Sequence, residues 1–239
     1  MAGITRVDQV QSASAAAEGA RTITLPTLQD DDFVLLAVGL VTASAPAVTV
    51  AGWSNDVPLV RPGTSTFRMG LWSKRAVAAS DSGATITVSS TVSGEIGVIA
   101  RAYRGVDTTT AYDVTIGTAN SGTADATPDC PSLTPATDGA MVVDFYGMAT
   151  TTNTNWTDWT PPSGFGTAKT ACSTIASVNN AAIGSADLLQ ATAAATGIMT
   201  ATAGPAASPQ AHPWAAFSIA LRPAAAPTPP GNGLWGVHL

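Results

Sequence analysis

The spacing of apolar residues along the chain predicts β-strands almost throughout. Residues 84–89 (ATITVS) alternate apolar and hydroxyl side chains, which is typical of a strand with one face on a core and the other in water. Residues 216–221 (AFSIAL) alternate in the same way between small and large side chains. Residues 33–38 (FVLLAV) are apolar throughout, as expected for a central strand that is covered on both faces. The pattern therefore predicts an all-β protein.

Turn signals separate these strands, and helix signals are scarce. Clusters of Gly, Pro, Asp, Asn and Ser mark turns such as the one at residues 160–164 (TPPSG). Residues 12–18 (SASAAAE) have a composition that could form one or two helical turns. Residues 188–195 also have helix propensity, but their position in the chain matches residues 77–83, which we expect to be a strand end and a turn. We therefore interpret residues 188–195 as strand and loop.

The chain contains a weak internal repeat. Four segments of the first half recur in the same order in the second half: residues 32–38, 52–53, 69–72 and 99–104, then residues 138–143, 164–165, 181–184 and 217–222. The offset is 112 residues between Trp53 and Phe165 and 118 residues between Arg104 and Arg222. A repeat with this spacing indicates two related sets of strands, and it points to a scaffold rather than to a catalyst.

Two architectures fit the repeat. Either each half is an independent immunoglobulin-like sandwich, or both halves interleave into one large two-sheet β-sandwich of jelly-roll or lectin-like type. Each half offers about four convincing strands, whereas an immunoglobulin-like domain needs about seven. A lone half would leave one sheet face uncovered. We therefore predict a single all-β sandwich over residues 1–222, with repeat halves at about 1–110 and 130–222.

The chain changes character after Arg222. Residues 223–230 (PAAAPTPP) predict a stiff, extended spacer that does not join a sheet ladder, because prolines lack the amide donor. Residues 231–239 form a short apolar and aromatic tail. We expect this tail to dock onto another chain. The four candidate docking residues are Leu234, Trp235, Val237 and Leu239.

Composition excludes several classes of function. Charged residues make up 11% of the chain, against roughly 25% in an average soluble protein, so the surface is neutral and rich in hydroxyl groups. The net charge is -6, and Lys74 and Lys169 are the two lysines, which argues against nucleic acid as a partner. Residues 1–6 lack the charged segment and apolar region of a signal peptide, and no run of 18 apolar residues predicts membrane insertion.

Side chains that usually carry chemistry are few and dispersed. Cys130 and Cys172 are too few for a disulfide framework and are wrongly spaced for zinc. We interpret them as two free thiols; the alternative is that they pair with each other. His212 and His238 lie far apart, so a shared role would need a coincidence of folding. Residues 30–32 (DDD) lack the spacing of a calcium loop and are interpreted as a solvated turn. We expect no catalytic residue, no metal site and no cofactor.

A polar loop near residue 155 is the main candidate for ligand binding. Trp156 and Trp159 lie among Asn and Asp residues, and an exposed indole beside such groups suits the face of a sugar and its hydroxyls. The alternative is that one or both indoles cap the edge of the sandwich. The candidate glycan contacts are Trp156, Trp159, Asn153, Asn155 and Asp158. The tryptophans assigned to the core are Trp53, Trp72 and Trp214.

Several of these segments resemble a family of tailed-bacteriophage virion proteins, usually described as minor tail or tail-fibre-associated proteins with a lectin-like sandwich. The matching segments are residues 32–38 (DFVLLAV), 52–53 (GW), 71–76 (LWSKRA) and 103–107 (YRGVD), and the second half matches through the repeat. The chain departs from the family at Asp31, where a glycine is usual, and the aromatic tail has no counterpart in it. The family has no shared catalytic residues to transfer.

The resemblance implies a non-enzymatic bacteriophage virion structural protein of the peripheral tail or fibre apparatus, assembled in the host cytoplasm. The implied partners are other virion proteins of the tail, fibre or capsid, further copies of the chain in a homo-oligomer, and a host surface glycan. A capsid decoration or head-spike protein is the alternative within the same class. A carbohydrate-binding module or glycan depolymerase is the alternative from another class; it predicts solvent-facing tryptophans or a cleft lined by carboxylates.

Overall fold

The structure, a computed structural model, describes residues 3–150, 158–166, 168–172, 180–204 and 211–226. These residues form strands and one single-turn helix, so the predicted all-β class is confirmed. The first half contains β1 (Thr5–Ala13), β2 (Glu18–Thr24), β3 (Phe33–Val41), β4 (Val48–Val50), β5 (Ser54–Val60), β6 (Phe67–Arg75), α1 (Ala78–Asp81) and β7 (Thr85–Arg104). The second half contains β8 (Gly117–Asp125), β9 (Asp129–Cys130), β10 (Ala140–Thr150), β11 (Trp159–Thr160), β12 (Lys169–Cys172), β13 (Asn180–Gln190), β14 (Met199–Thr200), β15 (Thr202–Ala203) and β16 (His212–Leu221).

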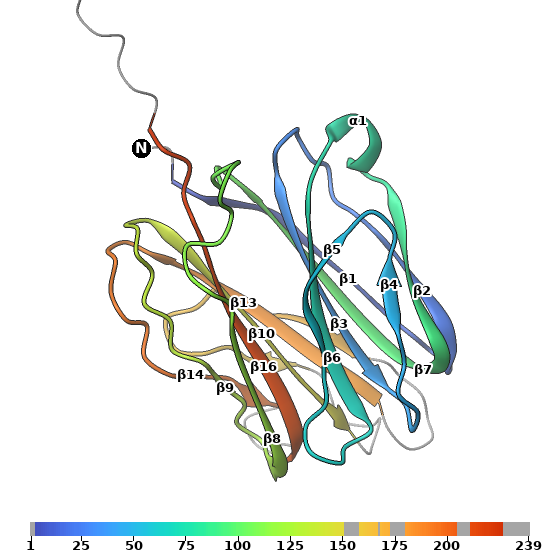
Figure 1. The fold of residues 1–239 in the computed structure, drawn as a ribbon. Coiled ribbons are helices and arrows are strands. Elements are labelled where there is room, and N and C mark those ends of the chain that lie inside the picture. Colours follow the sequence, from blue (N-terminus) through green and yellow to red (C-terminus); the bar gives the residue numbers. More distant parts are fainter. Residues whose placement is uncertain (1–2, 151–157, 167, 173–179, 205–210, 227–239) are drawn as a thin grey trace, which may run out of the picture.

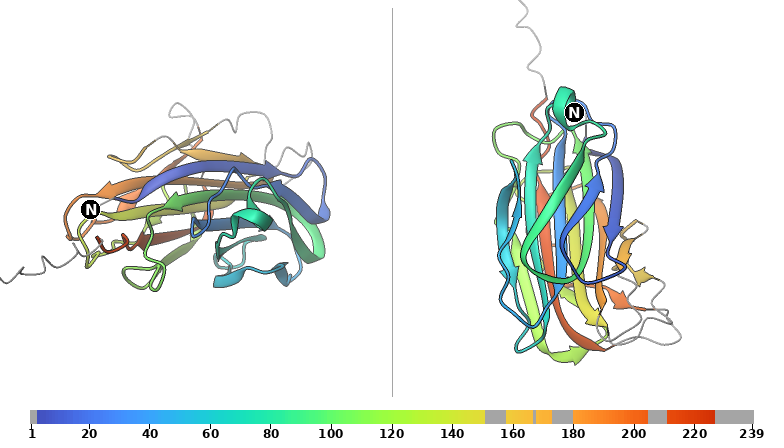
Figure 2. Two further views of the ribbon diagram at one scale, coloured as in Figure 1. Left: turned by 90° about the horizontal axis from the view of Figure 1, so that it is seen from above. Right: turned by 90° about the vertical axis from the view of Figure 1, so that its right-hand side faces the viewer.

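Each half of the chain builds one main antiparallel sheet, and the two sheets have the same strand order. The order is β1-β7-β3-β6-β5 in the first half and β8-β16-β10-β13-β12 in the second. In both halves, the first strand in the sequence (β1 or β8) pairs with the last one (β7 or β16). The central strand of each sheet, β3 or β10, is fully buried. The strands of both sheets run along the long axis of the body (Figures 1 and 2). The repeat in the sequence is therefore a repeat of topology.

Local backbone features repeat as well. Gly52 and Gly164 both adopt positive φ angles, 77° and 86°. The residues that follow close the same kind of turn, in which Trp53 N donates to Val50 O at 3.2 Å and Phe165 N donates to Pro162 O at 3.1 Å. A positive φ favours glycine, which explains why both turns keep Gly before the aromatic residue.

Short outer strands cover the outer face of each main sheet. The first part of β7 pairs with β2 and β4, while its second part pairs with β1 and β3. In the second half, β9 pairs with β14 and β11 pairs with β15. Among the described residues, the first half thus contains seven strands and the second nine, and the expectation of about four per half was too low. Several of the missed strands, such as β4, β9 and β11, are only two or three residues long, which is too short to produce a periodic pattern.

Three apolar clusters hold these layers together. The inter-sheet core lies between the two main sheets and contains residues from both halves, including Phe67, Phe145 and Phe217. The first outer core, around Leu36 and Trp72, contains residues of the first half. The second outer core, around Trp214, contains residues of the second half. The halves therefore stack through a shared core, each contributing one main sheet, and do not interleave their strands.

A buried ion network crosses the inter-sheet core. Arg101 on β7 is fully buried, and its guanidinium donates to Asp187 Oδ2 at 2.7 Å and to Ser185 Oγ at 2.6 Å, both on β13. Tyr103 OH donates to the same Asp187 oxygen, and Arg6 donates to the other oxygen at 2.8 Å. Buried charges are costly unless paired, so this network favours one relative placement of the two halves.

Three local expectations need correction. Residues 12–18 form the end of β1 and the turn into β2, and residues 77–83 contain α1, so the first segment is not helical and the second is. Residues 188–195 are strand and loop as predicted. The spacer is also not wholly separate from the sandwich. Pro223 forms a β-bridge with Val106, and Ala224 N donates to Gly105 O at 2.8 Å. Proline lacks a donor, but the residues on either side of it still pair, because Arg222 O accepts from Asp107 N at 2.9 Å and Ala224 N donates.

Candidate binding groove between two sheet edges

A hollow on the described surface, which we call the edge groove, lies between the outermost strands of the two main sheets. β5 is one edge of the first sheet, and β8 is one edge of the second. Residues 56–60 line one wall, and Tyr112, Thr115, Ile116 and Thr118 line the other. The volume is about 600 Å³. This falls within the range of about 300–1,000 Å³ typical of ligand pockets.

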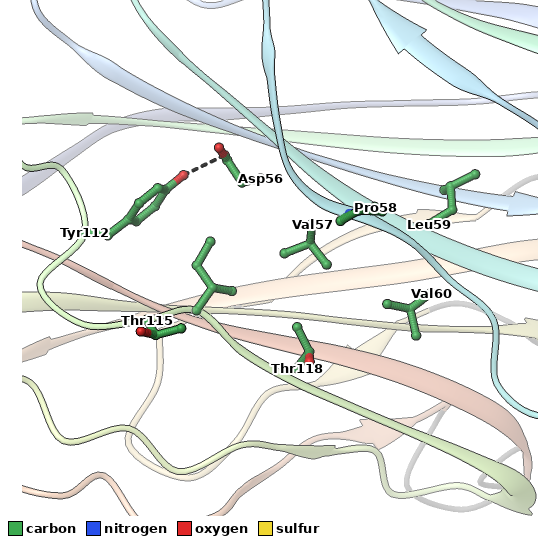
Figure 3. Close-up of a pocket in the computed structure, with 9 residues that line it drawn as sticks. Asp56, Val57, Pro58, Leu59, Val60, Tyr112, Thr115 and Thr118 are labelled. Carbon is green, nitrogen blue, oxygen red and sulfur yellow. Dashed lines mark hydrogen bonds between the residues drawn. The ribbon is translucent and has the colours of Figure 1, made fainter.

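The groove is the place where the inter-sheet core reaches the surface. Val57 and Val60 point from β5 towards β8, whereas Leu59 points to the opposite side of the strand (Figure 3). Val57 belongs to the inter-sheet core, and Val60 and Ile116 pack against it. Leu59 packs against the first outer core. Val57 and Val60 share a face because the register of β5 shifts between them, and they give the groove an apolar floor that continues the interior of the sandwich.

A tyrosine and a carboxylate form the polar end of the groove. Tyr112 OH donates to Asp56 Oδ2 at 2.6 Å (Figure 3). The Tyr112 ring also meets Phe33 edge-on, with ring centroids 5.7 Å apart. Burial, together with the hydrogen bond to Asp56, raises the pKa of Tyr112. The phenol therefore stays protonated and holds Asp56 across the two walls.

The segment that carries Tyr112 is fixed by its neighbour Asp113. Asp113 accepts hydrogen bonds from the Thr137 hydroxyl at 2.6 Å, from two backbone amides at residues 136–137, and from Arg222 Nε at 3.0 Å. Burial alone would raise the pKa of Asp113, but these hydrogen bonds lower it overall. Tyr112 itself bridges to Leu221 at the end of β16. The wall is therefore tied to the second sheet at several points, and the groove is preformed.

The opposite side of the sandwich is closed. There the other two edge strands, β1 and β12, lie against each other. Arg6 on β1 reaches Asp187 and adds an ion pair at 2.8 Å on that side. Because the two sheets have the same strand order, β5 and β8 are the counterparts of β12 and β1. The two seams are therefore equivalent. The described residues fill the seam between β1 and β12 and leave the edge groove unfilled.

The chemistry of the groove suits binding rather than bond cleavage. Its floor is aliphatic, its rim carries the hydroxyls of Thr115 and Thr118, and its carboxylate, Asp56, is already engaged by a phenol. Such a lining favours an apolar or aromatic side chain with a few polar groups at its border. No other carboxylate lines it to form the pair that glycoside hydrolysis requires.

The structure corrects one candidate of the polar loop. Trp159 is only 2% exposed, and its ring packs on Tyr146 with centroids 4.9 Å apart. A Cβ at Gly184 would clash with both rings, so glycine there makes room for them. Of the two interpretations, Trp159 therefore follows the one in which the indole packs into the sandwich, and it is not an exposed sugar contact. Asp158 is exposed, and its carboxylate accepts from Thr170 Oγ1 at 2.7 Å.

Other candidates lie outside the described residues. These are Asn153, Asn155 and Trp156 of the polar loop, and Leu234, Trp235, Val237 and Leu239 of the tail. His238 lies there too, whereas His212 is half-buried at the start of β16, where burial lowers its pKa. Cys130 is a buried free thiol, and burial raises its pKa. Among the predicted core tryptophans, Trp72 and Trp214 are buried and Trp53 packs against the first outer core.

The run of aspartates is a solvated turn at Asp30 and Asp31, which are exposed as predicted, but not at Asp32. Asp32 is 1% exposed and receives two hydrogen bonds from Arg104, at 2.8 and 2.7 Å. Asp30 accepts from the Ala78 amide at 2.7 Å and so holds the start of α1. Within the part of the chain that the structure describes, no group of three or more His, Cys, Asp or Glu side chains is placed to hold a metal ion. In the same part, no helix has the length and apolar character to cross a membrane.

Sequence reasoning missed the edge groove. Its walls come from segments more than 50 residues apart, and their proximity follows from the stacking of the sheets. One signal was present: residues 56–60 (DVPLV) combine three aliphatic side chains with a proline, which is typical of an edge strand. Comparison of the chain with protein-family models, with curated proteins and with solved structures finds no match.

Proposed function

We propose that this protein is a non-enzymatic structural protein of a bacteriophage virion, in the peripheral tail or fibre apparatus, where it acts as a minor tail protein. The observation that carries the proposal is the edge groove: a preformed apolar seam whose carboxylate is already bound by Tyr112. Such a seam can bury the side chains of a neighbouring protein.

The use of charge in the fold supports this proposal. Three buried carboxylates are each held by a basic side chain: Asp32 by Arg104, Asp113 by Arg222, and Asp187 by Arg101. Removing either member of such a pair is costly, so these groups stabilise the scaffold. Catalysis instead needs titratable groups that are free to exchange protons in a cleft.

One backbone feature supports the resemblance to tail proteins. Asp31 adopts a φ of 67°, in the left-handed region that favours glycine, and the family usually has glycine at this position. Gly139, which precedes β10 as Asp31 precedes β3, has a φ of 78°. The departure from the family pattern thus keeps the backbone conformation, since Asp tolerates this region better than most residues.

Assembly with other virion proteins, and with further copies of the chain, follows from this proposal. A host surface glycan is an additional proposed partner through the polar loop, where Asp158 is the exposed candidate among the described residues. Localisation in the virion, after assembly in the host cytoplasm, belongs to the same proposal.

The proposal is tested by the protein content of purified particles. Gradient-purified particles of the phage that encodes the chain should contain it at a fixed stoichiometry, and gold-labelled antibodies should mark the tail or fibres. Label on the head would favour a capsid decoration or head-spike protein. Absence from particles, together with glycan cleavage by the purified protein, would favour a depolymerase and contradict the proposal.

A further inference from the structure

The edge groove differs from the equivalent seam on the opposite side of the sandwich, which is filled. On the opposite seam, β1 and β12 contact each other and Arg6 adds an ion pair to Asp187. At the edge groove, β5 and β8 leave about 600 Å³ between them. Val57, Val60 and Ile116 extend the inter-sheet core into this space. An extended segment with one apolar face would therefore complete the second seam as β1 and β12 complete the first.

The C-terminal segment of the chain has this pattern. Residues 235–239 (WGVHL) place large apolar side chains at every second position, with Gly and His between them. This period of two puts Trp235, Val237 and Leu239 on one face of an extended strand. Residues 223–239 contain no Asp, Glu, Lys or Arg, so their burial desolvates no strongly charged side chain.

The path of the chain favours a neighbouring copy as the acceptor. The described chain ends at Ala226, after Ala224 pairs with Gly105, and it leaves the sandwich beside the N-terminus (Figure 1). Tyr112, at one end of the groove, lies close to this exit because it bridges to Leu221, so the tail would have to turn back directly after the stiff spacer to enter the groove of its own copy. Residues 227–230 (PTPP) contain three prolines and favour an extended spacer. At about 3.1 Å per residue, residues 227–233 span about 22 Å, enough to reach a second copy.

We propose that residues 234–239 of one copy dock into the edge groove of the next, with Trp235 against Val60 and Ile116. The contact is heterologous, because tail and groove are different surfaces, and it links copies in a ring or a row. This inference rests on the proposed function, in which several copies assemble in one particle, and it names a second copy of this chain as the partner of the groove.

A mixing experiment tests the exchange directly. One variant lacks residues 227–239, so it has a groove and no tail. The other carries Thr118→Arg, which places a long charged side chain in the groove at an exposed position of β8. We expect wild type to self-associate with rising concentration in sedimentation velocity, each variant alone to stay monomeric, and the mixture to form one-to-one dimers. The matched control is Thr22→Arg, the same change at an exposed strand position away from the groove.

A peptide measurement makes the result independent of oligomer formation. A fluorescent peptide of residues 231–239 should bind the tail-deleted protein, and Thr118→Arg in that background should weaken binding at least tenfold, while Thr22→Arg changes it less than twofold. The proposal is overturned if the peptide does not bind, if it binds the Thr118→Arg protein equally well, or if it binds while the mixture stays monomeric. In each case, detection of the protein in purified particles would leave the proposed function standing.

Discussion

Asp144 offers a sharp test of how this fold uses its polar residues. Its carboxylate lies on β10, is fully buried, and faces the second outer core. Neither oxygen makes a hydrogen bond of normal geometry among the described residues. Asp144 pairs across strands with Ser218, where the first half has Leu36 paired with Ala100. The second half thus carries a polar pair at a position where the first half is apolar.

Burial sets the protonation state of this group. Burial raises the pKa of Asp144 to about 8, and the nearby Ser218 and Cys130 act in the opposite direction. The usual value is 3.8. Between these values the folded protein keeps the proton and the unfolded chain releases it, so the free energy of unfolding falls as pH rises. The slope is about 1.4 kcal/mol per pH unit, or about 3 kcal/mol from pH 5 to pH 7.

Asp144→Asn removes this titration while nearly preserving shape. We expect the free energy of unfolding of the variant, relative to that of wild type, to increase by about 3 kcal/mol from pH 5 to pH 7, as measured by urea unfolding at both values. Burial lowers the pKa of His212, so His212 makes the free energy of unfolding rise with pH. This contribution is the same in both proteins and cancels in the difference between variant and wild type. Asp8→Asn, at an exposed carboxylate on β1, is the control and should leave the slope unchanged. Equal slopes for wild type and Asp144→Asn would refute the reasoning.

Two further substitutions test the packing of the halves. Arg101→Met is expected to cost about 3–5 kcal/mol in urea unfolding, because it leaves Asp187 buried without its main cation; a cost below about 1 kcal/mol would show that the network does not hold the halves together. Gly184→Ala places a methyl group against the rings of Tyr146 and Trp159, and we expect a loss of about 1–3 kcal/mol and a changed tryptophan fluorescence spectrum. Unchanged stability and fluorescence would contradict the close packing of Trp159 on this glycine.

The main strands could be predicted because their patterns are local. Residues 84–89 alternate and lie in β7, and residues 33–38 are apolar and lie in the central strand β3. The recurrence of Gly before an aromatic residue marked the same turn in both halves. Outer strands such as β4 and β11 are too short to leave a pattern, so the number of strands per half was underestimated.

Long-range polar contacts could not be predicted in the same way. Alternation along β7 places Arg101 on the inward face with Ile99 and Tyr103, but its partner Asp187 is 86 residues away. Asp32 looked like part of an exposed acidic turn because its partner, Arg104, is 72 residues away. The edge groove has the same origin, since it depends on how the two sheets stack.

A map of the intact particle tests the central claim most directly. Under the proposed function, cryo-electron microscopy of the bacteriophage particle should show the two stacked sheets at the periphery of the tail or fibres. In that map, density for residues 234–239 should fill the groove between β5 and β8 of an adjacent copy. A particle at high resolution with no density for this fold would contradict the account.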